Sequence, residues 1–184
     1  MIKEKYDLRI LQGLSKKQLA KRYGLKLFNT LNEAFADLFG YVPLNDKQKE
    51  FYINQYFPFL DKRLICLVVD KNDDVVAFGI SMPSLSNALR KCKGRLFPFG
   101  WIHLLKALKI FENIDLYLNG VKPEWQNKGI HSIYYAEMNK QYIKLGSKMA
   151  IADPQLETNQ AANIWKKYDS RIAIRRRAYI KTIE

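Results

Sequence analysis

Residues 114–131 read I-D-L-Y-L-N-G-V-K-P-E-W-Q-N-K-G-I-H, and this stretch decides the fold. Its first part alternates apolar with polar residues from Ile114 to Leu118, which predicts a β-strand. Gly120 and Pro123 then end the strand, because glycine admits unusual dihedrals and proline cannot donate to a ladder. From residue 130 to residue 145 apolar side chains recur at helical spacing. The stretch therefore predicts a strand, a short loop and a helix.

The junction between this strand and helix has the chemistry of an anion site. The first amide N–H groups of a helix lack internal partners, and the helix dipole adds roughly half a positive charge there. Gly129 lets a phosphate approach the backbone without meeting a Cβ atom, and Lys128 adds a cation. The alternative is an ordinary strand-to-helix turn, which the glycine alone would favour.

The residues of this junction resemble the coenzyme A signature of the GNAT acyltransferase superfamily, V-x-P-x-x-[QR]-x-x-G-x-[GA]. Four residues match at the family's spacing: Val121, Pro123, Gln126 and Gly129. The last position is His131 instead of glycine or alanine, although an imidazole N–H can itself bond a phosphate. The resemblance implies that acetyl-CoA is the cofactor and that this loop holds its pyrophosphate. The implied cofactor-binding residues in this region are Asn119, Val121, Gln126, Asn127, Lys128, Gly129, Ile130 and His131.

The same resemblance implies how acyl transfer would be catalysed. In GNAT enzymes a backbone N–H of the fourth strand polarises the thioester carbonyl, and here the segment Asn119 to Val121 would supply it. A carboxylate on that strand often serves as the base. Asp115 lies six residues before the motif valine, where the histone acetyltransferase branch carries its base. The alternative is a solvent-facing or structural aspartate.

A tyrosine in the next helix commonly protonates the departing thiolate, within the pattern N-x-x-A-x-x-L-Y. Asn159 and Ala162 are in register with this pattern, but Lys166 occupies the tyrosine position and Tyr168 follows two residues later. Tyr168 is the candidate acid, although two residues turn a helix by about 200°, which favours a packing role. Asn159 is the candidate contact for the pantetheine arm, with a helix N-cap as its alternative.

Length and composition indicate one domain spanning residues 1–184, with 48% hydrophobic and 27% charged residues. No apolar run approaches the roughly 18 residues that a membrane helix needs. The N-terminus has no apolar signal segment. The two cysteines, Cys66 and Cys92, show no metal-ligand spacing. We therefore expect a cytoplasmic protein with reduced thiols and no metal site.

The net charge of +13 requires a partner or a solvated basic surface. Lysines and arginines gather in residues 16–26, 90–95 and 175–177. Such a protein can bind nucleic acid, an anionic membrane surface or a polyanionic cofactor. The phosphates of coenzyme A suit the excess of cations without accounting for all three clusters. Nucleic acid is an alternative partner that we do not favour.

Hydrophobic periodicity and turn residues predict the other elements. The first elements are a short strand at 6–10, a helix from the Ser15 capping box to Gly40 that Gly24 bends or splits, and a helix from Asn45 to Pro58. A hairpin of strands 64–71 and 75–82 and short helices within 84–111 follow. After the central stretch we expect a strand at 148–153, a helix at 159–168 and a strand at 172–180. This order resembles the GNAT fold along nearly the whole chain.

The expected fold class is therefore α/β (α+β), with a mixed, mostly antiparallel central sheet flanked by helices on both faces. A helical insertion, residues 84–111, separates the third and fourth strands. It mixes cations with aromatics, so we expect it to select the acceptor. The alternative is a basic surface helix whose aromatics fill the core.

The function that these features imply is an acetyl-CoA-dependent N-acetyltransferase acting on a primary amine by direct attack on the thioester. The alternative is a GNAT-fold module without catalysis that binds a partner, such as nucleic acid, through its basic surface. Lys166 and His131 favour the alternative. The four matching residues of the loop favour the enzyme.

Overall fold

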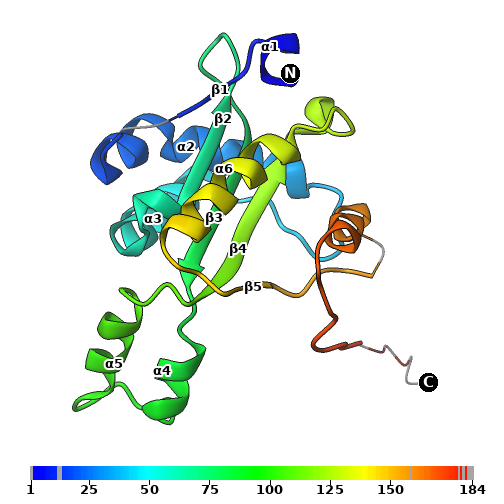
Figure 1. The fold of residues 1–184 in the computed structure, drawn as a ribbon. Helices are drawn as coiled ribbons and strands as arrows, with labels where there is room; N and C mark the ends of the chain where they lie inside the picture. The colour runs from blue at the N-terminus through cyan, green and yellow to red at the C-terminus, as the bar shows by residue number, and fades with distance from the viewer. Residues whose placement is uncertain (1, 12–13, 158, 178, 180, 182–184) are drawn as a thin grey trace. The chain divides into compact units, whose positions relative to one another are not determined.

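The computed structural model describes residues 2–11, 14–157, 159–177, 179 and 181. They form two compact units, Met1–Asp153 and Pro154–Glu184. The first unit holds the sheet, the helices on both of its faces and the insertion (Figure 1).

A five-stranded sheet is the centre of the first unit, and its strands lie in chain order, β1-β2-β3-β4-β5. The strands are β1 (Arg9–Ile10), β2 (Ile65–Val69), β3 (Val75–Pro83), β4 (Asn113–Val121) and β5 (Met149–Ala152). The first four pair antiparallel, and β5 runs parallel to β4. The predicted mixed, mostly antiparallel sheet is confirmed.

Helices cover both faces of this sheet, as predicted (Figure 1). The helix α6 (His131–Lys144) covers one face and packs closely on Gly79 of β3, where a Cβ atom would meet the Met138 and Tyr134 side chains of α6. The helix α2 (Lys16–Phe35) covers the other face and packs closely on Gly120 of β4, where a Cβ atom would meet Ala34 of α2. The third helix, α3 (Asp46–Tyr56), packs on α2.

The starts of α2 and α3 follow from their capping residues. The Ser15 hydroxyl accepts from the Gln18 N–H while the Gln18 side chain accepts from the Ser15 N–H, and Asn45 caps α3 in the same way. Gly24 does not split α2, which is continuous from Lys16 to Phe35, and a Cβ atom there would come within 2.9 Å of the Ile53 side chain of α3. The helix ends at Phe35, before the predicted stop at Gly40.

The β2–β3 turn is tied to α2 through one carboxylate, Asp73. Asp73 accepts from the Tyr23 hydroxyl at 2.8 Å and from Arg22 at 2.9 Å, and it also pairs with Arg9. Lys26 donates to the Asp73 carbonyl oxygen at 2.7 Å. The turn, β1 and α2 are therefore held at a common point on the surface.

The predicted insertion is present as two short helices, α4 (Ser86–Lys91) and α5 (Gly100–Ala107). In Figure 1 they lie below the sheet, at the end where β4 begins, while α1 and the turn after β4 lie at the upper end. The aromatics at its tip do not fill the core, because Phe97 is 83% exposed and Phe99 is 69% exposed.

Both ends of the chain differ from the prediction. The first described residues form a helical turn, α1 (Ile2–Lys5), so that the predicted strand at 6–10 shrinks to β1. Away from the ends, two short 3-10 turns that were not predicted follow α3: η1 (Phe57–Phe59) and η2 (Lys62–Leu64). In the second unit the predicted α-helix is a 3-10 helix, η4 (Gln160–Lys167). The predicted last strand is wrong, because residues 172–177 and 179 are outside any strand.

Candidate functional site

The pairing of β4 with both neighbouring strands changes in the middle of β4. The register with β3 skips Tyr117, which stands between the paired residues Leu116 and Leu118. A β-bulge of this kind leaves one residue outside the ladder and bends the strand. On the other side the pairing with β5 ends at Leu116, whereas β4 continues to Val121. Over the described strands, the segment of β4 that was predicted to polarise the thioester carbonyl, Asn119 to Val121, lies beyond the last pair with β5.

The loop after β4 is a compact turn that leads into α6. It begins with η3 (Pro123–Trp125), after which the Gln126 side-chain amide donates to the Val121 carbonyl oxygen at 3.2 Å. Asn127 and Gly129 both have left-handed backbones, with φ of 59° and 77°. Gln126 thus closes the turn, and the two left-handed residues reverse the chain before the helix.

Three backbone N–H groups of this loop lack a protein acceptor among the described residues. The N–H groups of Ser132 and Ile133 donate to the carbonyl oxygens of Gly129 and Ile130, at 3.0 Å each. No such bond involves the N–H of Lys128, Gly129 or Ile130 in the described part of the chain. Ile130 as a whole residue is only 1% exposed, so Lys128 and Gly129 are the accessible residues of the three. These groups and the positive end of the α6 dipole favour an anion.

The N-terminal turn lies on the same loop. The Tyr6 and Trp125 rings meet edge to face at 6.0 Å, and the Lys128 ammonium lies over both of them. A Cβ atom at Gly129 would come within 2.9 Å of the Ile2 side chain. The left-handed φ therefore favours glycine at position 129 whether or not a ligand binds, and a Cβ atom there would also displace the end of the Ile2 side chain.

Asp115 lies near the other end of β4 as one of two neighbouring carboxylates. Burial raises its pKa, and a hydrogen bond with Ser84 opposes that rise. Burial also raises the pKa of Asp153, and the charge of Asp115 raises it further. A carboxylate with a raised pKa is a better proton acceptor at neutral pH than an ordinary one.

Tyr117 links this pair of carboxylates to two tyrosines of α3. Burial raises the pKa of Tyr117, and Tyr56, Asp153 and Tyr52 raise it further. Sequence patterns indicated Asp115 but not the other members of this cluster. Alternation along β4 places Tyr117 on the side of Asp115, which was the available signal, but Tyr52 and Tyr56 lie on α3, about 60 residues away in the sequence.

The open edge can accommodate an elongated ligand. Strands rise about 3.3 Å per residue, so roughly 20 Å separate Asp115 from Val121. A ligand with an anionic end would place that end at the loop before α6 and its other end near the carboxylates. Backbone groups on the β5 side of β4, beyond its last pair with β5, would line the path between them.

Three further predicted site residues are His131, Asn159 and Tyr168. His131 is exposed at the first position of α6. Asn159 and Tyr168 belong to the second unit, where the Tyr168 ring lies 6.2 Å from the Trp165 ring. Their assigned roles stay predictions. Burial raises the pKa of the Cys66 thiol to about 12, so this thiol is not a nucleophile at neutral pH.

The described residues contain no cluster of three or more histidine, cysteine, aspartate or glutamate side chains that could hold a metal ion. None of their helices is long and apolar enough to cross a membrane.

A curated protein matches part of this chain in sequence. No protein-family model matches the chain. A bacterial ceramide synthase of Caulobacter vibrioides is 28% identical over 102 residues, which are 54% of this chain and 26% of that protein. The chain therefore spans about a quarter of the length of the curated relative that it matches.

Comparison with solved structures gives the fold. The ribosomal-protein-S18-alanine N-acetyltransferase from Escherichia coli aligns with this chain at a TM-score of 0.58 and 14% identity. The alignment covers 95% of this chain and 85% of that enzyme. An aminoglycoside acetyltransferase from an uncultured soil sample aligns with 99% of both chains, at a TM-score of 0.55 and 12% identity. The aminoglycoside acetyltransferase AAC(6')-Iy, bound to a coenzyme A bisubstrate analogue, aligns with 96% of this chain at a TM-score of 0.55 and 11% identity. The chain has the GNAT acetyltransferase fold.

Proposed function

We propose that this chain is an acetyl-CoA-dependent N-acyltransferase, which transfers an acetyl group to a primary amine by direct attack on the thioester. One observation carries the proposal: the half of β4 that has no partner on its β5 side leads from the Asp115 carboxylate to a loop where the accessible residues Lys128 and Gly129 have N–H groups without a protein acceptor. Acyl transfer needs a base, a polarised carbonyl and a site for the leaving group's phosphates, and this edge offers all three.

Each group has a proposed role along this edge. The N–H groups of Lys128 and Gly129 bind the pyrophosphate, with the Lys128 ammonium beside them, and the buried Ile130 anchors the start of α6 behind them. The backbone between Asn119 and Val121 polarises the thioester carbonyl. Gln126 supports the loop through its bond to Val121. Asp115 accepts the proton of the attacking amine.

The remaining predicted contacts complete the proposal. Asn127 and His131 flank the three N–H groups of the loop and contact the phosphates. Asn159 contacts the pantetheine arm, and Tyr168 protonates the departing thiolate. Tyr117 is a second candidate for this last step, because its raised pKa keeps the phenol protonated within the Asp115 cluster.

The curated relative supports a second candidate for the substrates. Ceramide is an amide of a long-chain amine and a fatty acid, so its synthesis is also an N-acylation. The partial match to a ceramide synthase and the exposed apolar tip of the insertion favour a lipid amine as acceptor and a longer acyl group on coenzyme A. We do not favour the alternative of an inactive module that binds nucleic acid.

Calorimetric titration and thermal unfolding with coenzyme A thioesters test the proposal. A ligand at a hundred times its dissociation constant adds about 2.7 kcal/mol to stability. For a chain of this size the melting temperature should rise by about 5–10 °C. Acetyl-CoA and palmitoyl-CoA should be compared, and mass spectrometry of amine mixtures would then identify the product. The proposal fails if neither thioester shifts the melting temperature at millimolar concentration.

A further inference from the structure

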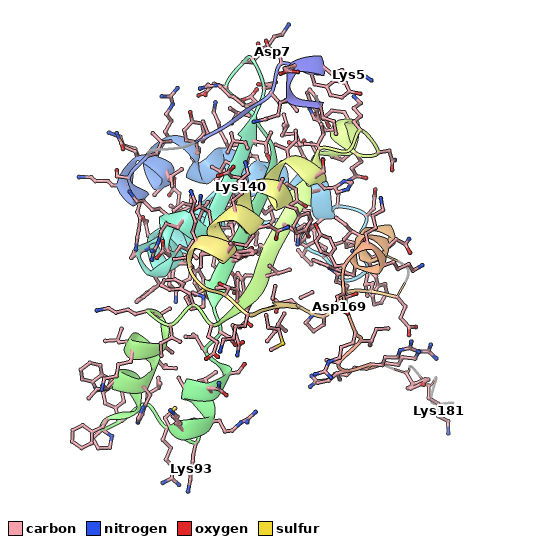
Figure 2. All side chains as sticks on the ribbon, viewed as in Figure 1. Lys5, Asp7, Lys93, Lys140, Asp169 and Lys181 are labelled. Carbon is pink, nitrogen blue, oxygen red and sulfur yellow. The ribbon has the colours of Figure 1, made fainter. Side chains whose placement is uncertain are left out.

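The insertion between β3 and β4 carries basic side chains and no acidic side chain that would neutralise them. Residues 84–111 contain no aspartate and no glutamate. They contain six cationic side chains, which are Arg90, Lys91, Lys93, Arg95, Lys106 and Lys109. Figure 2 shows Lys93 at the outer end of the insertion, far from the sheet. Such a concentration of positive charge indicates either an anionic partner or a surface that is simply solvated by water.

The same insertion exposes its largest apolar side chains. Residues 95–99 are all exposed, and Phe97 and Phe99 are the most exposed of its aromatics. Leu89 and Leu96 are also exposed, at 46% and 44%. Single exposed apolar residues are ordinary, whereas a group of exposed apolar residues that follows a run of cations in one short segment indicates an interaction surface.

A fixed backbone, and not a lack of structure, produces this exposure. The Trp101 indole N–H donates to the Pro98 carbonyl oxygen at 3.0 Å, and the Trp101 backbone N–H donates to Leu96 at the same distance. A Cβ atom at Gly100 would fall 1.8 Å from the Arg95 carbonyl oxygen, so only glycine fits there. The loop is folded onto itself and turns its two phenylalanines outward.

We propose that residues 84–111 dock the protein on the surface of an anionic phospholipid membrane. Phe97 and Phe99 enter the boundary between headgroups and acyl chains, which amphipathic surface segments reach at a depth of about 5–10 Å. The cations of the insertion contact the lipid phosphates, as polybasic segments beside membranes do.

The side chains favour a lipid surface over nucleic acid. Bases stack on aromatic rings, so a single-stranded binding site would need the two phenylalanines but not the exposed leucines beside them. A bilayer accepts both aromatic and aliphatic side chains and presents a uniformly anionic plane to the cations. The absence of any acidic side chain in 84–111 suits that plane.

Docking would bring the lipid surface to one end of the candidate site. The insertion leads directly into β4, and Asp115 is the third residue of that strand. A lipid amine could then reach the carboxylates while coenzyme A enters from the loop before α6. Membrane docking itself does not depend on the proposed acyl transfer, because its measurement requires no turnover.

Sedimentation with lipid vesicles tests the proposal on the full chain. The protein should bind phosphatidylcholine–phosphatidylglycerol vesicles at least tenfold more tightly than phosphatidylcholine vesicles, and high salt should weaken the binding. The double variant Phe97→Ser/Phe99→Ser should lose at least tenfold in affinity for the mixed vesicles. Its control is Phe39→Ser/Val42→Ser, which changes two side chains that are 86% and 76% exposed elsewhere.

A matched pair of charge variants separates the insertion from net charge. One variant replaces the cations at 90, 91, 93 and 95 with glutamine, and the other replaces the exposed Lys17, Lys21, Lys47 and Lys71. Both reduce the formal charge from +13 by four, to +9. Only the first should lose vesicle binding. Equal losses in both variants would overturn the proposal, as would insertion variants that lose single-stranded oligonucleotide binding but keep vesicle binding.

Discussion

Asp115 has opposite expected effects on activity and on stability. As the base it should be required for turnover, so Asp115→Asn should lower kcat by a factor of about 10² to 10⁴ and leave coenzyme A affinity near normal. The acid limb of the pH–rate profile that reports its ionisation should also disappear. The control is Glu112→Gln, an exposed residue just before β4, which should not change turnover. Unchanged turnover in Asp115→Asn would instead make this aspartate structural.

Stability should respond to pH in the direction that burial dictates. Because burial raises the pKa of Asp115 in the folded protein, folding is most stable below the ordinary pKa and loses stability as pH rises towards the folded pKa. Asparagine is neutral throughout and can keep the bond with Ser84. Asp115→Asn should therefore melt at or above the wild-type temperature at neutral pH and match it near about pH 3, below the ordinary aspartate pKa. Thermal unfolding at the two pH values measures this, and a lower melting temperature at neutral pH would contradict it.

Lys128 tests the anion loop more cleanly than Gly129 does. Any side chain at position 129 would have to adopt a left-handed φ and would meet Ile2, so Gly129→Glu would disturb α1 as well as the ligand. Lys128 is exposed, and Lys128→Gln should fold normally while weakening acetyl-CoA binding by about tenfold, or 1.4 kcal/mol. Calorimetric titration measures the loss. The control Lys144→Gln removes the same charge from the last turn of α6, so an equal loss there would exclude a specific phosphate contact.

At the scale of elements, Asp73 should show how firmly the β2–β3 turn is tied to α2. Burial would raise the pKa of Asp73, but hydrogen bonds from Tyr23 and Arg22 hold it below the ordinary value. The carboxylate therefore stabilises the fold above its ordinary pKa, and this stability is lost as pH falls through the folded pKa. Asparagine tolerates the left-handed backbone found here, with φ of 66°.

The variant Asp73→Asn should accordingly lose about 1 kcal/mol of unfolding free energy at neutral pH, the scale of a small surface network. The deficit should shrink at acid pH, as the Asp73 carboxylate of the folded protein becomes protonated. Urea unfolding at the two pH values measures it. Asp37→Asn, at an exposed aspartate, is the matched control and should lose nothing. A deficit that persists at acid pH would mean that backbone geometry, and not charge, ties the turn to α2.

Local patterns predicted the elements whose reasons are local. The capping boxes at Ser15 and Asn45 set the starts of α2 and α3, and the alternation after Ile114 gave β4. The loop before α6 followed from its glycine and its spacing. Patterns failed where contacts distant in sequence decide: Gly24 fits Ile53 of α3, and Tyr52 of α3 acts on Tyr117 of β4.

The candidate site divides in the same way. Asp115 and the loop residues lie in one continuous stretch, so sequence could name them. Asp153 joins the site only because β5 pairs in parallel with the first half of β4, which no local pattern states. The bulge at Tyr117 likewise depends on the register with β3. The tail alternates apolar and basic residues after Ile172, yet its described part pairs with no strand, because alternation alone supplies no neighbour.

At the scale of the whole molecule, the two units differ in what holds them together. Every described hydrophobic residue that is buried lies between Leu8 and Tyr142. The unit Pro154–Glu184 contributes none of them, although it carries Asn159, Tyr168 and three consecutive arginines. Stability should therefore reside in the first unit, because buried apolar area is the main source of folding free energy.

A chain that ends at Asp153 tests this division and the prediction of a single domain. It should unfold cooperatively in urea with a midpoint close to that of the full chain, since it keeps the sheet, all of its covering helices and the core. It should also bind acetyl-CoA through the loop before α6. If Tyr168 protonates the thiolate, this shortened chain will bind the thioester without turning it over. If Tyr117 does so, turnover will survive, and Tyr117→Phe in the full chain will abolish it. A shortened chain that cannot fold would show that residues 154–184 complete the domain.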